Sequence, residues 1–265
     1  MNWIEEAPLW LVAPLLMVSL VALNELGMRL ARSGAQQNIS GEARGYMVSS
    51  ALALLGLLMA FTFSAAQARF VLRQELVVAE ANAISTTYLR IQLLDQPWRA
   101  DLSRQIVQYA QLRAGFDEAA GPNAIADNAR QTAAAQGRIW EALGGAVHAN
   151  TILPVNLALI NSANETFDLA ATRRAARETC VPPSILYALL ASSLLVSGMV
   201  GFAAGGGKQV HIGVSTGVMA LVTLAFCLIL DLDRPVSGAV RVSSAPMQYM
   251  LDDVRRSEAA AAQAP

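Results

Sequence analysis

Charged residues are scarce in this chain. Only 15% of its 265 residues are charged, against about a quarter in an ordinary soluble domain, and 54% are hydrophobic. Intrinsic disorder is excluded, because it requires low hydrophobicity and high net charge, whereas the net charge here is −1. The balanced charge also argues against a strongly basic surface, so we expect no nucleic-acid partner.

Cysteine, histidine and catalytic motifs are scarce as well. The two cysteines, Cys180 and Cys227, form neither a CxxC pair nor a Cys/His spacing typical of a metal site. The two histidines, His148 and His211, are far apart, and no serine-hydrolase, zinc-protease, P-loop or dinucleotide-binding motif occurs. We therefore predict that the protein is not an enzyme and has no catalytic residue, metal site or cofactor.

The chain does contain four long apolar runs. They cover residues 7–23 (extending to about 30 if a helix continues past Pro14), 45–68, 184–205 and 212–230. Each supplies roughly the 20 residues that a helix needs to cross a bilayer. The first run follows Glu5 and Glu6 rather than basic residues, which favours a retained transmembrane helix over a signal peptide. The sequence therefore predicts a multi-pass protein embedded in a lipid bilayer.

The second and third runs are separated by a polar insertion, residues 69–181, that is rich in helix formers and lacks strand-like alternation. Neither glycine nor proline occurs from Leu57 to Asp95, which predicts that the second membrane helix continues as a rod of about 50 residues until Pro97. Further helices are predicted over about 98–113, 127–147 and 157–178, with a loop at 115–124. The expected fold class is all-α, with four transmembrane helices and a helical insertion between the second and the third.

These segments divide the chain into residues 1–68 with two membrane helices, the helical domain 69–181, residues 182–235 with the other two membrane helices, and a C-terminal tail, 236–265. An even number of spans places both termini and the helical domain on one face of the membrane. Seven juxtamembrane arginines lie on that face, namely Arg69, Arg73, Arg173, Arg174, Arg177, Arg234 and Arg241. The opposite face has four basic residues, Arg29, Arg32, Arg44 and Lys208. The N-terminal tail has none, which alone favours the opposite orientation, but the larger count predicts that the termini and residues 69–181 are cytoplasmic.

Polar side chains recur on two predicted helices of the insertion. Glu80, Asn82 and Arg90 lie on the continuation of the second membrane helix, and Asn161 and Asp168 lie on the last helix before the third. Such groups could form a polar network inside a helical bundle or line an aqueous vestibule beneath a pore. Buried polar groups normally find partners, which favours the network.

Two aspartates end the fourth membrane helix. Asp231 and Asp233 meet the negative end of the helix dipole, an arrangement that costs about 0.3–1 kcal/mol, so we expect a compensating partner. Arg234 or Arg69 could supply a salt bridge. A calcium ion is the alternative, but it takes about 6–8 oxygen ligands, and two carboxylates are few.

The second membrane helix carries no charge and offers candidates for a pore lining, namely Leu57, Phe61, Phe63 and Ser64. In an oligomer, a ring of Leu57 and Phe61 could form a hydrophobic constriction that gates by dewetting. Most apolar stripes on membrane helices instead face lipid or other helices, and small residues such as Gly56 and Ala60 would allow close packing.

Four segments together suggest a family. They are AFTFS (60–64), EANAI (80–84), TTYLR (86–90) and LDLDRP (230–235). With the order of the helices, they resemble the bacterial bestrophin-like family of unknown function, which is remotely similar to the bestrophins. Bestrophins are pentameric chloride channels with four transmembrane helices and a cytoplasmic helical region.

The resemblance implies a homo-oligomer, pentameric in the family's pattern, that conducts chloride or another anion across the bacterial inner membrane. In bestrophins the second helix lines the pore with apolar and aromatic side chains, which is where Leu57, Phe61 and Phe63 fall. The acidic cluster that binds Ca²⁺ in animal bestrophins is reduced here to Asp231 and Asp233, and the proline-phenylalanine-glycine stretch after that helix is absent. The alternative function is that of a membrane-anchored interaction or sensory protein whose helical soluble domain binds a partner.

Overall fold

The computed structural model describes residues 7–35, 40–117, 121–205, 212–234 and 238–263, and every regular element in these ranges is helical. The elements are α2 (Leu9–Leu30), a π-helical turn (Ala31–Ala35), α3 (Gly41–Ile91), α4 (Trp98–Ala114), α5 (Pro122–Ala149), α6 (Leu153–Glu178), α7 (Pro183–Gly205), α8 (Ile212–Asp233) and α9 (Ala245–Gln263). Four segments of the described chain are long and apolar enough to cross a membrane. The all-α prediction with four membrane helices is confirmed.

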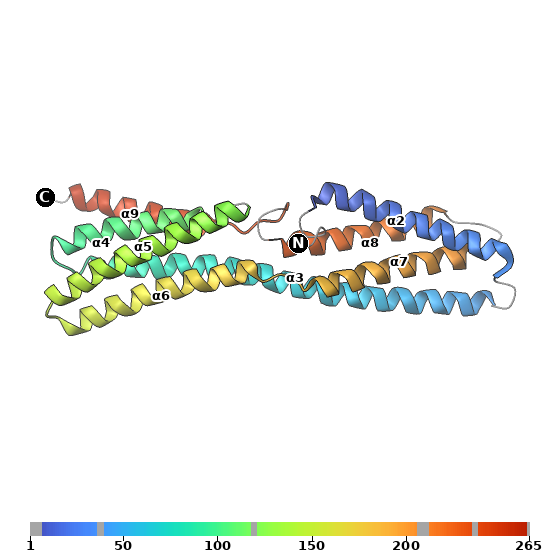
Figure 1. The fold of residues 1–265 in the computed structure, drawn as a ribbon, viewed down its shortest axis with the longest axis horizontal. Coiled ribbons are helices and arrows are strands. Elements are labelled where there is room, and N and C mark those ends of the chain that lie inside the picture. Colours follow the sequence, from blue (N-terminus) through green and yellow to red (C-terminus); the bar gives the residue numbers. More distant parts are fainter. Residues whose placement is uncertain (1–6, 36–39, 118–120, 206–211, 235–237, 264–265) are drawn as a thin grey trace. The chain divides into compact units, whose positions relative to one another are not determined.

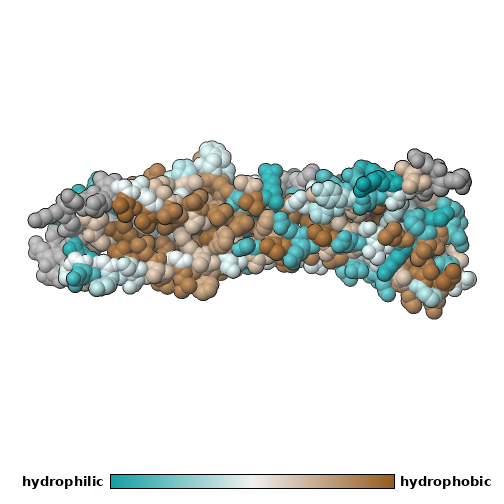
Figure 2. All heavy atoms as spheres, turned by 180° about the vertical axis from the view of Figure 1, so that it is seen from behind, coloured by the Kyte–Doolittle hydropathy of each residue, from teal (hydrophilic) through white to brown (hydrophobic). Residues whose placement is uncertain are grey.

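The chain forms two compact units. The membrane unit holds residues up to Arg69 together with Cys180–Val240, and the helical unit holds Phe70–Thr179 and Arg241–Pro265. In the membrane unit, α2 packs against α7 and α8 (Figure 1). On the face shown in Figure 2, apolar side chains cover most of the unit that holds these helices, as expected of a surface in contact with lipid.

Close packing of α2 against α7 depends on glycine. A side chain at Gly27 would meet the backbone of Gly198, and one at Gly201 would meet the backbone of Asn24. The hydroxyl of Ser197 also donates a hydrogen bond to the Leu20 carbonyl across this contact, at 2.6 Å. Small residues and interhelical hydrogen bonds hold membrane helices together because lipid gives no hydrophobic drive for their association.

Helix α3 is a single helix of 51 residues, and it runs unbroken through the stretch from Leu57 that the absence of glycine and proline predicted to be helical. It ends at Ile91, so the predicted stop at Pro97 is wrong by one and a half turns. The chain leaves the helix through tighter bonds between residues three apart, from the N–H of Leu93 to the Arg90 carbonyl and from that of Leu94 to the Ile91 carbonyl, both 3.1 Å. Pro97 instead precedes the first turn of α4.

Two other helix boundaries differ from those predicted. Helix α5 begins at Pro122 rather than near 127, and α6 begins at Leu153 rather than near 157. Both have a proline in the first turn, where a helix needs no N–H donor and the fixed φ of proline suits the helix. The predicted loop at 115–124 is therefore wrong at its C-terminal end, because it includes the start of α5.

The helical unit has one apolar core, to which five helices contribute. Its buried members include Ile84 and Tyr88 of α3, Ile106 and Tyr109 of α4, Ile139 and Leu143 of α5, Leu159 of α6, and Met247 and Leu251 of α9. Each set recurs at intervals of three or four residues, so it forms one face of its helix. This core fixes α3 against the helices that carry the unit's charged groups.

Candidate functional site

Three of the four predicted pore-lining residues, Leu57, Phe61 and Ser64, belong to one exposed row on α3. In the single chain Leu57 is 51% and Phe61 66% exposed, and Ser64 is exposed as well. Phe63 is half-buried and lies on a neighbouring side of the helix. Leu55, Thr62 and Ala66 are buried, so α3 packs through one face and leaves the other without cover from its own chain.

The same spacing of three and four residues continues into the helical unit. The exposed positions there are Val71, Glu75, Val78, Asn82 and Leu89. Val78 is 46% and Leu89 60% exposed, although both lie beyond the apolar run that spans the membrane. A row that keeps an average spacing of 3.5 residues is typical of a helix that associates with other helices along its length. The exposed residues at this spacing are called the α3 row. They are Leu54, Leu57, Phe61, Ser64, Ala68, Val71, Glu75, Val78, Asn82 and Leu89.

The predicted polar candidates lie in different surroundings. Asn82, Asn161 and Asp168 are exposed, whereas Glu80 is fully buried. Arg90 is half-buried, and its Nη1 donates a 2.7 Å hydrogen bond to the Ala158 carbonyl of α6.

The buried polar face of α6 is a different one from the predicted face. Thr166 and Ser162 lie on it, and the Thr166 hydroxyl is 2.9 Å from that of Thr87 on α3. Sequence analysis selected the exposed face because asparagine and aspartate mark it more clearly than serine and threonine do.

Glu80 is the centre of a buried ion cluster. Arg113 of α4 binds both of its carboxylate oxygens, with Nε 2.5 Å from Oε1 and Nη2 3.2 Å from Oε2. Arg173 of α6 donates to Oε2 at 2.7 Å and also binds the carboxylate of Asp117. Since Glu80, Arg113 and Arg173 are almost completely buried, the cluster ties three helices together in a dry environment.

An aromatic ring lies beneath the arginines of this cluster. The guanidinium carbons of Arg113, Arg177 and Arg173 lie 4.3, 4.9 and 5.1 Å from the centroid of the Phe116 ring. Arg177 also donates a hydrogen bond to the Phe116 carbonyl. Cation–π contacts of this kind are strongest where the cation is shielded from water.

The cluster shifts the pKa values of its members. Burial opposes the charge of Arg173, but Asp117 and Glu80 more than compensate, so its pKa is raised. Burial lowers the pKa of Arg177, although Asp117 counteracts part of this effect. Burial, reinforced by the negative charge of Glu80, raises the pKa of Tyr109 to about 12.

Sequence analysis missed every partner of Glu80. Arg113 follows Ile106, Tyr109 and Ala110 on the buried face of α4, and this spacing was the available signal. Arg173 and Arg177, like Arg73, were counted only as markers of membrane orientation. All three are buried, and Arg73 donates to the carbonyls of Ala176 (3.3 Å) and Thr179 (3.0 Å). Their structural roles give an independent reason for their presence.

The two aspartates at the end of α8 are buried and bind backbone groups. Asp233 accepts the N–H of Val181 at 2.9 and 3.1 Å, just before α7. Asp231 accepts the N–H groups of Ala239 and Val240 at 2.9 and 3.0 Å. These neutral N–H donors compensate the carboxylates at the C-terminal end of the helix. Arg234, the partner considered in the sequence analysis, is also buried.

A metal site has no support in the described part of the chain, where no three His, Cys, Asp or Glu residues are placed so that they could hold an ion together. Asp231 and Asp233 each use both carboxylate oxygens on backbone N–H groups. These oxygens are the ligands that calcium would require.

The fold and these features define a class: a membrane protein with four spanning helices and a helical unit outside the apolar segments. Comparison with known proteins identifies the family. The family model of the Bestrophin-like domain matches residues 15–247, and the chain belongs to the Bestrophin-like family.

Solved structures show the same fold. A bacterial bestrophin homologue from Klebsiella pneumoniae, carrying a single mutation, superposes with a TM-score of 0.67 at 17% sequence identity, over 92% of this chain and 96% of that one. A structure of a bestrophin homologue from the same organism, phased with zinc, gives 0.64 at 18% identity over 91% and 96%. No curated protein matches the sequence.

Proposed function

We propose that the protein is an oligomeric ion channel of the bestrophin type, in which α3 lines the pore and anions such as chloride are the permeant ions. The observation that carries this proposal is the α3 row, whose positions are exposed from Leu54 to Asn82 and again at Leu89, with half-buried Ser85 between them. A ring of identical chains with these rows facing a common axis would form a continuous path. Family membership supports the proposal, since bestrophins are channels.

Leu57 and Phe61 are the proposed constriction. They lie one helical turn apart and are the large apolar members of the α3 row near the middle of the spanning segment. A narrow ring of apolar side chains stops conduction by excluding water, so it acts as a gate. Ser64 follows one turn later and would offer hydroxyl groups on the far side of this ring. Phe63, being half-buried, is proposed to pack beside the pore rather than to line it.

A channel of this design requires a closed ring of chains. Exposed apolar residues outside the membrane, such as Val71, Val78 and Leu89, are consistent with a neighbouring copy along the helical unit. We propose a homo-oligomer and, following the bestrophin pattern, a pentamer.

Ion flux from liposomes that contain the purified full-length protein tests the channel. We expect chloride to pass in preference to gluconate, and Phe61→Ala and Leu57→Ser to raise the chloride flux severalfold because they remove the apolar ring. Leu221→Ala is the matched control, since Leu221 is equally exposed but lies on α8. Cross-linking of the same samples should give a series of bands that ends at the size of one closed ring of chains.

Flux that is unchanged in both pore variants would refute the pore assignment, and potassium flux exceeding chloride flux would refute anion selectivity. A folded protein that gives no flux and cross-links only to a monomer or dimer would favour the second candidate, a membrane-anchored interaction or sensory protein. The observation behind that candidate is a second exposed apolar patch at the start of α6, formed by Ile152, Leu153 and Leu157.

The proposed location is the bacterial cytoplasmic membrane, with both termini and residues 69–181 in the cytoplasm. The arginine count of the sequence supports this orientation. No catalytic role is proposed for any residue.

A further inference from the structure

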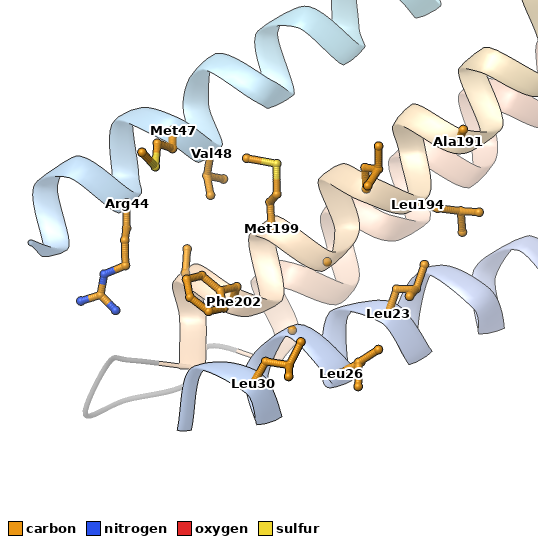
Figure 3. Close-up of a pocket in the computed structure, with 14 residues that line it drawn as sticks. Leu23, Leu26, Leu30, Arg44, Met47, Val48, Ala191, Leu194, Met199 and Phe202 are labelled. Carbon is orange, nitrogen blue, oxygen red and sulfur yellow. The ribbon is translucent and has the colours of Figure 1, made fainter. Parts of the chain in front are cut away.

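An apolar groove of about 570 Å³ lies between α2, α3 and α7 in the membrane unit. Figure 3 shows that Leu26 and Leu30 project into it from α2, Met47 and Val48 from α3, and Met199 and Phe202 from α7. Leu26, Leu30 and Met47 are at least half exposed, so the groove opens to the surface of the unit.

The groove has a charged end and an apolar end. Arg44, in the first turn of α3, is the charged residue that lines it, and Figure 3 places Arg44 at the opposite end from Ala191 and Leu194. Along α7 the lining extends from Ala191 to Ala203, a rise of about 18 Å. Arg44 lies where α3 begins, and the N-terminus of a helix also carries partial positive charge.

We propose that this groove binds an anionic phospholipid of the leaflet on the side where α3 begins, with an acyl chain along the apolar lining and the phosphate at Arg44. The charge pattern matches that of a lipid in both sign and direction, because the headgroup lies at the membrane surface and the chain extends inward. Arginine suits phosphate because its planar guanidinium donates two parallel hydrogen bonds. The flexible side chains of Met47 and Met199 can adapt to a mobile acyl chain.

The groove is separate from the proposed pore. Val48 precedes Leu57 by nine residues, which places the two about 180° apart around α3. Met47 lies one heptad before Leu54, so a neighbouring copy on the α3 row would border the groove at Met47. The side of the groove formed by Val48 and α7 would stay open to lipid.

Competition between two lipids tests the proposal on the full-length protein. Detergent-purified protein is stripped of lipid, offered equal amounts of phosphatidylglycerol and phosphatidylcholine, and examined by native mass spectrometry. We expect the wild type to prefer phosphatidylglycerol by about fivefold, the effect of one arginine near an anionic headgroup. Arg44→Ala should abolish this preference. Arg29→Ala should keep it, because Arg29 is exposed and paired with Glu25, at 3.0 Å, outside the groove.

A second pair of variants tests the apolar part. Ala191→Trp fills the groove and should lower retention of both lipids severalfold, whereas Ala220→Trp on the exposed side of α8 should retain them as the wild type does. Equal retention in all variants would mean surrounding bilayer lipid only and would overturn the proposal. Loss of the oligomer in Ala191→Trp without loss of lipid would also overturn it, because a second chain would then occupy the groove.

If Ala191→Trp fails to fold, quenching of tryptophan fluorescence tests the lipid site instead. Quenching is measured as the difference from the wild type, because the native tryptophans include Trp10, which is 72% exposed on α2. By this difference, brominated phosphatidylglycerol should quench Met199→Trp more than brominated phosphatidylcholine does, and it should quench Leu221→Trp no more than the neutral lipid does. Equal quenching of Met199→Trp by the two lipids would refute the site. Neither readout depends on ion flux, so the lipid-binding proposal and the channel proposal can be refuted independently.

Discussion

At the scale of single residues, Glu80 holds the helical unit together. Its carboxylate pairs with two arginines that are 2–3% exposed and receives three hydrogen bonds from them, while Asp117 supplies a second negative charge to Arg173. A buried ion pair of this kind adds little stability over an apolar core of the same shape, but removing one partner leaves an uncompensated buried charge. The cluster therefore makes the packing of α3, α4 and α6 sensitive to a single side chain.

We expect Glu80→Ala to lower the free energy of unfolding by about 3–5 kcal/mol, because Arg113 and Arg173 lose their common partner in a buried environment. The measurement is thermal and denaturant unfolding of the full-length protein in detergent. Glu141→Ala is the matched control: Glu141 is an exposed glutamate of the same unit, on α5, and its removal should change stability by less than about 0.5 kcal/mol. Equal losses in the two variants would show that the cluster has no special role.

At the scale of elements, α9 is the helix that sequence analysis left within a C-terminal tail. Met247, Met250, Leu251 and Val254 are buried and follow the spacing of a helical face, and α9 packs against α4. The hydroxyl of Tyr88 also donates to Glu258, at 3.4 Å. Only four apolar positions in a stretch otherwise rich in charge and alanine carry this signal, which is why the tail did not stand out.

We expect Leu251→Ala to destabilise the docking of α9 by about 2–4 kcal/mol, through lost apolar burial and the cavity left behind. A terminal helix with one packed face opens locally before the whole chain unfolds. Hydrogen exchange should therefore accelerate in residues 245–263 and on the facing part of α4, with the membrane helices unaffected. Tyr249→Ala, at an exposed position of the same helix, should leave exchange unchanged. Uniform acceleration throughout the chain would contradict local docking.

At the scale of the whole molecule, several arginines counted for membrane orientation also hold the fold together. Arg73, Arg173 and Arg177 are buried in the helical unit and Arg234 in the membrane unit, so they have structural partners as well as positive charge. The orientation proposed above therefore needs a direct test.

Alkaline phosphatase fused after Pro265 provides it, because this enzyme is active only in the periplasm. We expect no activity from this fusion and strong activity from one made after Gly205, which ends α7 on the opposite side. The reverse result would place residues 69–181 outside the cytoplasm and would overturn the proposed orientation.

The sequence by itself determined the properties that depend on local chemistry. Apolar runs of sufficient length predict membrane helices, and the lack of glycine and proline after Gly56 predicts that α3 continues beyond the membrane. Four short segments suggest the family that the comparisons establish. Only the tertiary structure decided which polar residues meet. Glu80 and Arg173 are 93 residues apart, and Asp233 reaches the backbone of Val181 across 52. Hydropathy and helical period describe one element at a time, whereas these partners come together only when separate helices pack, which is why Asn161 and Asp168 were selected and Arg113 was not.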